Sequence, residues 1–159
     1  MKNYYFTSES VTEGHPDKLA DLISDSILDE YLKQDKNSRV AVETFASGNK
    51  ITIEGQVTSK GKVEIEKLVR KTIKEIGYEN ANIDIDYKTC EIQVNITEQS
   101  PDIAMGVDIG GAGDQGIMFG YACDETEEYM PYAISMAHKL SKKLTEVRKS
   151  NEIEYIRPD

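Results

Sequence analysis

The stretch RVAVETFASGNKITIEGQVT, residues 39–58, decides the fold class, because it has the pattern of two β-strands joined by a tight turn. In its second half, apolar residues at 51, 53 and 57 alternate with polar residues at 52, 54 and 56, the period of a strand with one buried face. Ser47-Gly48-Asn49 supplies turn residues between the halves. The stretch therefore predicts a hairpin with strands at Arg39–Ala46 and Lys50–Thr58.

Two amphipathic helices flank the predicted hairpin. From Pro16 to about Leu32, apolar residues occupy one face and four aspartates, at positions 17, 21, 25 and 29, occupy the other. We expect this aspartate stripe to be a solvated face and not a row of metal ligands. A second helix is predicted at Val63–Ile76, where apolar residues recur at helical spacing and Gly77 follows as a stop signal.

Two short alternating stretches, Ile83–Tyr87 and Glu91–Ile96, are predicted to be further strands. With the hairpin and the two helices they predict an α+β domain at residues 1–98, a sheet with helices packed on one face. Residues 99–116 follow as a glycine-rich junction.

The remaining residues, 117–159, predict fewer elements than a closed domain needs. We expect a strand at Ile117–Ala122, a helix at Tyr129–Lys149 and the beginning of a strand at Glu152–Ile156. These elements predict the incomplete start of a second, similar domain. The apolar residues expected to face inward from the helix are Met130, Ala133, Met136, Ala137, Leu140, Leu144 and Val147.

Charge and hydropathy exclude several classes of function. Lysine and arginine number 19 against 29 aspartates and glutamates, and a net charge of −10 repels the phosphates of nucleic acids. No apolar run reaches the roughly 20 residues of a membrane span, and the first residues lack a secretory signal's apolar core, so we expect a cytoplasmic protein. Cys90 and Cys123 are too few for a disulfide framework and are expected to be reduced core thiols.

The first segment that could carry chemistry is TSESVTEGHPDK, residues 7–18, which ends where the first helix begins. His15 and Lys18 could bind phosphate oxygens, since a helix N-terminus favours anions, while Asp17 could hold a hard cation such as Mg²⁺. The alternative is a capped helix start, with Thr12 or Ser10 as the cap and Asp17 interacting with the helix dipole.

A second segment, Gly111-Ala112-Gly113-Asp114-Gln115-Gly116, has the letters of a dinucleotide-binding fingerprint. A loop precedes it and an apolar stretch follows it, so the required strand and helix are absent from the pattern and a dinucleotide site is not expected. The remaining alternatives are a flexible turn between domains, or a loop whose backbone approaches a ligand closely while Asp114 and Gln115 contact it.

Three polar residues of the hairpin, Glu43, Glu54 and Gln56, form a weaker candidate, because their face of the sheet could line a cavity or simply meet water. His138, in the last helix, is interpreted as a surface or packed histidine.

The segments Phe6–Lys18 and Gly111–Ala122 together closely resemble the S-adenosylmethionine synthetase (methionine adenosyltransferase) family. Gln99–Ile103 and the closing Ile156–Asp159 are also similar to that family, so the resemblance runs from Tyr5 to the last residue. Family members are considerably longer and contain three similar α+β domains. The resemblance therefore implies a complete N-terminal domain and the opening of the central one.

The family resemblance implies an enzyme that forms S-adenosylmethionine from ATP and L-methionine, with release of pyrophosphate and phosphate. It implies Mg²⁺ and K⁺ as cofactors and a homodimer or homotetramer with shared active sites. His15 would stabilise the leaving triphosphate, Lys18 would lie near the phosphates, Asp17 would bind Mg²⁺ and Glu43 would bind K⁺. The remaining residues carried over are Gly113 and Asp114 for ATP, with Asp114 also counted as catalytic, and Gln56, Gln99 and Asp114 for methionine.

The chain departs from the family in three places. Gln56 stands where the family usually has a glutamate for the methionine ammonium group, and only Ile109-Gly110 separates Val107-Asp108 from Gly111, where many relatives have a longer lid segment. The later phosphate-binding lysines and arginine are missing, so we expect the 159 residues alone to be inactive. The alternative function is a non-catalytic nucleotide- or metal-binding module, or a regulatory one that docks onto a full-length synthetase.

Overall fold

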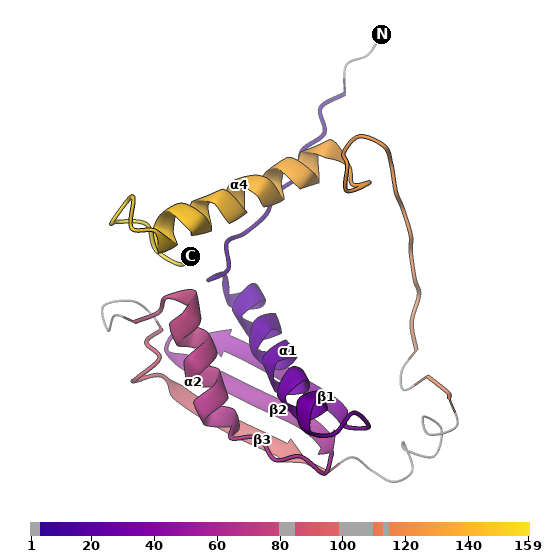
Figure 1. Ribbon diagram of the computed structural model, residues 1–159, viewed down its shortest axis with the longest axis vertical. Helices are drawn as coiled ribbons and strands as arrows, with labels where there is room; N and C mark the ends of the chain where they lie inside the picture. Colours follow the sequence, from indigo (N-terminus) through magenta and orange to yellow (C-terminus); the bar gives the residue numbers. More distant parts are fainter. Residues whose placement is uncertain (1–3, 80–84, 99–109, 113–114) are drawn as a thin grey trace. The chain divides into compact units, whose positions relative to one another are not determined.

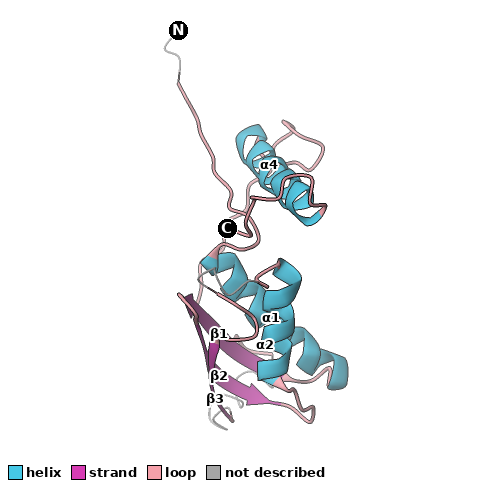
Figure 2. Ribbon diagram, turned by 90° about the vertical axis from the view of Figure 1, so that its left-hand side faces the viewer, coloured by secondary structure: helices cyan, strands magenta, loops and turns pink. Residues whose placement is uncertain are grey.

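A three-stranded sheet with two helices on one face forms the larger of two compact units in the computed structural model (Figures 1 and 2). The structure describes residues 4–79, 85–98, 110–112 and 115–159. The larger unit comprises Pro16–Gln115, and the smaller unit comprises Met1–His15 together with Gly116–Asp159. The α+β fold expected from the sequence is confirmed, while the division into domains at residues 98 and 116 stays a prediction.

Helix α1, Pro16–Gln34, and helix α2, Ile65–Ile76, cover the same face of the sheet. The structure confirms both predicted helices, α1 ending two residues later and α2 beginning two residues later than expected. Gly77 ends α2 in the left-handed conformation, with φ of 113°, and the next residue, Tyr78, donates its N–H to the Ile73 carbonyl as in a Schellman cap. The four aspartates of α1 are exposed, so the stripe is a solvated face as expected.

The sheet order is β1-β2-β3. Strand β1, Arg39–Ser47, pairs antiparallel with β2, Lys50–Thr58, which confirms the hairpin, and β2 pairs parallel with β3, Glu91–Thr97. The core lies between the sheet and the helices. Full burial of an aliphatic side chain contributes about 1.5–3 kcal/mol, so this layer dominates the stability of the unit. Its fully buried residues are Leu19, Ile23, Ile27, Ile51, Ile53, Val69, Ile73, Ile76 and Cys90.

The strand predicted at Ile83–Tyr87 is wrong where the structure describes it, since residues 85–87 are coil and turn. Asp86 organises a turn in their place: its carboxylate accepts the Lys88 N–H at 2.6 Å and its carbonyl accepts the Cys90 N–H at 2.8 Å. The turn is tied to the hairpin because the Asn49 side chain accepts the Asp86 N–H at 3.2 Å. Residues 83 and 84 lie outside the described part of the chain.

The two strands predicted after residue 116 are also wrong. Residues 117–122 form no strand, residues 152–155 lie in bends and turns, and Ile156 is coil. Strands need hydrogen-bonded neighbours, and the described residues supply none for either segment. Ile117, Met118 and Phe119 are accordingly exposed.

Helix α4, Tyr132–Lys149, confirms the helix of the smaller unit but begins three residues later than predicted. Tyr129 has φ of 58° and Pro131 occupies the N-cap, and both features prevent an earlier start. The apolar face was expected to point inward, but Met130, Leu140 and Leu144 are exposed and only Ser135 of the helix is buried. Ala133, Met136, Ala137 and Val147 of the predicted face are half-buried, so the expectation holds only in part.

Both cysteines are free, as expected. Cys90 is buried, and burial raises the pKa of its thiol, which keeps the thiol protonated at neutral pH. Cys123 is only half-buried, so its expected place in a core is wrong. None of the helices within the described residues carries an apolar stretch long enough to cross a membrane.

Candidate functional site

The segment that leads into α1 is held inside the smaller unit. The Thr12 hydroxyl donates to the Pro158 carbonyl at 2.7 Å, and Oγ of Ser10 lies 2.9 Å from Nδ1 of His138. Because α1 begins at Pro16, the residue that precedes it is His15, so the alternative that placed the cap at Thr12 or Ser10 is wrong in that detail. His138 is therefore a partner of this segment, a role that its sequence neighbourhood did not reveal.

His15, Asp17 and Lys18 follow one another across the boundary between the two units. His15 is half-buried and is the last residue of the N-terminal segment of the smaller unit, whereas Asp17 and Lys18 are exposed in the first turn of α1 in the larger unit. The N–H groups at the start of a helix attract anions, and the exposed ammonium group of Lys18 adds a positive charge beside them. Within the larger unit, Asp17 and Lys18 at the start of α1 suit a phosphate ligand with an accompanying cation.

Glu43, Glu54 and Gln56 share the face of the sheet that the two helices leave open. The strand register places Glu43 opposite Glu54, and both carboxylates are exposed. Nδ2 of Asn95 on β3 donates to Glu54 at 3.3 Å, while Gln56 is half-buried between Ala41 and Thr97 in the register. In the larger unit, these three residues therefore lie on the face of the sheet opposite the helices. Asp17 and Lys18 belong to α1, which covers the other face (Figure 2).

Three of the predicted site residues, Gln99, Gly113 and Asp114, lie outside the described residues. The structure therefore describes two groups of predicted site residues. We call His15, Asp17 and Lys18 the α1 entrance, and the face that carries Glu43, Glu54 and Gln56 the open sheet face. The roles of both groups stay predictions.

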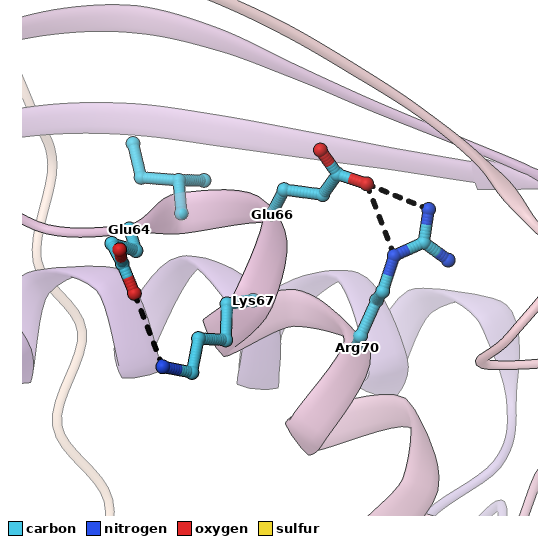
Figure 3. A pocket seen from close by; sticks show the side chains of 5 residues that line it. Glu64, Glu66, Lys67 and Arg70 are labelled. Carbon is cyan, nitrogen blue, oxygen red and sulfur yellow. Dashed lines mark hydrogen bonds and ion pairs between the residues drawn. The ribbon is translucent and has the colours of Figure 1, made fainter.

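A shallow pocket of about 470 Å³ lies at the beginning of α2, and the residues that line it are none of the predicted site residues (Figure 3). Its charged side chains pair with one another, Lys67 with Glu64 at 3.2 Å and Arg70 with Glu66 at 2.8 Å. Arg70 also donates to the Tyr87 carbonyl at 2.8 Å, which ties α2 to the turn before β3. The pocket offers a ligand no uncompensated charge, and its residues are explained by packing.

Few side chains in the described residues could bind a metal ion, but those of Asp17 and Glu43 carry the oxygen atoms that hard cations prefer. Among the residues that the structure describes, no three His, Cys, Asp or Glu side chains lie close enough together to hold a metal ion. Mg²⁺ bound to a nucleotide needs only one or two carboxylates, since phosphates and water complete its coordination. The exposed carboxylate of Asp17 therefore fits Mg²⁺ in the presence of a phosphate ligand, and Glu43 offers the oxygen donor that a hard monovalent cation takes.

Comparison with known proteins defines the class to which this fold and these segments belong. The model of the S-adenosylmethionine synthetase N-terminal domain matches residues 3–101, and that of the central domain of the same synthetase matches residues 109–159. The chain belongs to the S-adenosylmethionine synthetase family.

Curated relatives from three bacteria are named S-adenosylmethionine synthase. The chain is 52% identical to the protein of Brachyspira hyodysenteriae, and this match covers 100% of the chain. It is 54% identical to the protein of Oleidesulfovibrio alaskensis over 98% of the chain, and 53% identical to that of Clostridium tetani over 97% of the chain. It spans only 41–44% of the length of these relatives. The Brachyspira alignment runs over 172 positions for a chain of 159 residues, so that relative carries residues with no counterpart here.

Proposed function

We propose that this chain supplies the ATP- and methionine-binding part of a methionine adenosyltransferase. In that reaction the methionine sulfur forms a bond with C5′ of ATP while the C5′–O5′ bond breaks, and the triphosphate leaves with the electron pair before it is hydrolysed to pyrophosphate and phosphate. The observation that carries the proposal is the consecutive match to two domains of one synthetase, residues 3–101 and 109–159.

The α1 entrance would bind the triphosphate. His15 would donate a hydrogen bond toward O5′ as charge develops there, and Lys18 would neutralise the phosphates, with the helix N-terminus contributing its N–H groups. Asp17 would hold Mg²⁺, which when bound neutralises part of the leaving group's charge. Gly113 would let the backbone approach ATP, and Asp114 would act at the end of the site where the nucleoside meets methionine.

The open sheet face would bind methionine and K⁺. Two like charges directly opposite each other destabilise a sheet, and a cation bound at Glu43 would offset the repulsion between Glu43 and Glu54. Gln56 and Gln99 would contact methionine. Since this face is open within the larger unit, we place a second copy of the protein over it, in a homodimer or homotetramer with shared active sites. Both substrates are water-soluble, which agrees with a cytoplasmic protein.

The test uses a hybrid in which residues 1–159 replace the matching segment of the Brachyspira hyodysenteriae synthase. Asp17→Asn is compared with Asp21→Asn, because both aspartates are exposed on α1 one turn apart. If Asp17 binds Mg²⁺, Asp17→Asn lowers the rate of S-adenosylmethionine formation by orders of magnitude, while Asp21→Asn leaves it within about twofold.

A dipole role for Asp17 predicts a different result. The interaction of a carboxylate with the helix dipole contributes only about 0.3–1 kcal/mol of stability. If Asp17→Asn slightly lowers the melting temperature and leaves near-normal activity at ordinary Mg²⁺, Asp17 interacts with the dipole and does not bind Mg²⁺.

A further inference from the structure

Residues 12–15 form a turn that is hydrogen-bonded both within itself and to Pro158. The His15 N–H donates to the Thr12 carbonyl at 3.2 Å, which closes the turn. The Thr12 hydroxyl and the Gly14 N–H both donate to the Pro158 carbonyl, at 2.7 and 3.0 Å. The turn is therefore attached to the residues that follow α4, within the smaller unit.

Gly14 makes this attachment possible because no side chain would fit at its position. A Cβ atom there would lie 2.4 Å from both the carbonyl carbon and the oxygen of Pro158. Both residues are buried. The contact is thus a backbone-to-backbone packing that holds the peptide immediately before His15.

Glu13 lies between Thr12 and Gly14 and forms ion pairs with two basic side chains at the end of α4. Its carboxylate pairs with the Arg148 guanidinium and lies 2.9 Å from Nζ of Lys149. The Arg148 side chain is only 10% exposed and that of Glu13 28%, whereas the Lys143–Glu146 pair on the same helix is 68% and 54% exposed. Shielding from water strengthens the Glu13 interactions relative to an ordinary surface pair.

We propose that Glu13 is a positioning residue for the reaction: through Arg148 and Lys149 it fixes the turn of residues 12–15, and thereby the direction in which His15 is presented. The inference rests on the proposed function for the role of His15. No pattern in the sequence indicates this role of Glu13, because Glu13 and Arg148 are 135 residues apart.

The first test measures amide hydrogen exchange at Gly14 in the 159-residue chain and needs no activity. Glu13→Gln keeps the size of the side chain and removes its charge, and Glu146→Gln is the matched control because it removes an exposed ion pair from α4. We expect exchange at Gly14 to accelerate at least tenfold in Glu13→Gln and to stay within twofold in Glu146→Gln. An unchanged rate in both variants overturns the proposal.

The second test measures kcat and KM in the Brachyspira hybrid. Misdirection of His15 lowers kcat at least tenfold in Glu13→Gln and leaves the KM for methionine within twofold, while Glu146→Gln changes neither. Faster exchange with unchanged kcat would mean that Glu13 only stabilises the fold, and would overturn its positioning role. An inactive unmutated hybrid would instead contradict the proposed function, whatever the exchange rates show.

If Glu13→Gln does not fold, Arg148→Lys replaces it in both tests. This variant keeps the positive charge and loses the planar fork that holds a carboxylate in one orientation. We expect a smaller change in the same direction, and no change in exchange or kcat overturns the proposal.

Discussion

Gln56 is the residue at which the sequence predicts the most informative departure from the family pattern. It lies half-buried on the open face of the sheet, two residues after Glu54 on the same strand. In the proposed site it would face the methionine ammonium group with a neutral amide, where a glutamate would offer a charge.

We expect Gln56→Glu in the hybrid to lower the methionine KM about fivefold with little change in kcat. A charge-assisted hydrogen bond is worth about 1.5–3 kcal/mol against about 0.5–1.5 for a neutral one, and a difference of about 1 kcal/mol is roughly fivefold in affinity. The effect falls on KM because the ammonium group is remote from the reacting sulfur and is bound similarly in the ground and transition states.

Glu54 could already supply the missing charge, and a variant tests this directly. If it does, Glu54→Gln alone raises the KM and Gln56→Glu restores it. Should neither substitution change the KM by more than about twofold, position 56 does not contact the amino group.

Among the secondary-structure elements, those that depend on local interactions were predicted correctly from the sequence. Helical spacing and the Gly77 stop signal predicted α2 because the interactions that end this helix lie within a few residues of it. The strands predicted at Ile83–Tyr87 and Ile117–Ala122 are wrong in the described residues. A strand exists only with a hydrogen-bonded neighbour, and the sequence pattern does not show whether one is present. The same reasoning explains the site: the residues around His15 stand together in the sequence, but Arg148 and Lys149 reach Glu13 only through the fold.

The close pairing of β1 and β2 depends on Gly55, which has φ of 151°. A Cβ there would lie 2.1 Å from the Ala41 carbonyl oxygen and 2.8 Å from Cα of Val42, both in β1. We expect Gly55→Ala to lower the free energy of unfolding by about 1–3 kcal/mol, because β1 must move away from β2. Urea denaturation of the chain measures the loss.

Gly48→Ala is the control, since Gly48 also has a positive φ, 53°, but no atom lies within 4 Å of the added Cβ. Its cost should be limited to the backbone conformation, about 1 kcal/mol. A loss for Gly55→Ala no greater than that for Gly48→Ala would contradict the close approach of the two strands.

At the scale of the whole molecule, the chain contains two compact units and spans 41–44% of its curated relatives. Its described residues include the start of α1, where we propose that phosphate binds, and an open sheet face. The proposed reaction also needs further cations, because the triphosphate leaving group carries more negative charge than His15 and Lys18 balance. We therefore propose that these residues bind and position the substrates and that turnover requires the longer protein.

The most direct test is S-adenosylmethionine formation from ATP and methionine with Mg²⁺ and K⁺, measured side by side for the isolated 159-residue chain and for the Brachyspira hybrid. We expect methionine-dependent product and phosphate release by the hybrid, and none above background by the chain alone. Robust turnover by the isolated chain would contradict the assignment of turnover to the longer protein. A folded but inactive hybrid would contradict the enzyme function and favour a non-catalytic module that docks onto a full-length synthetase.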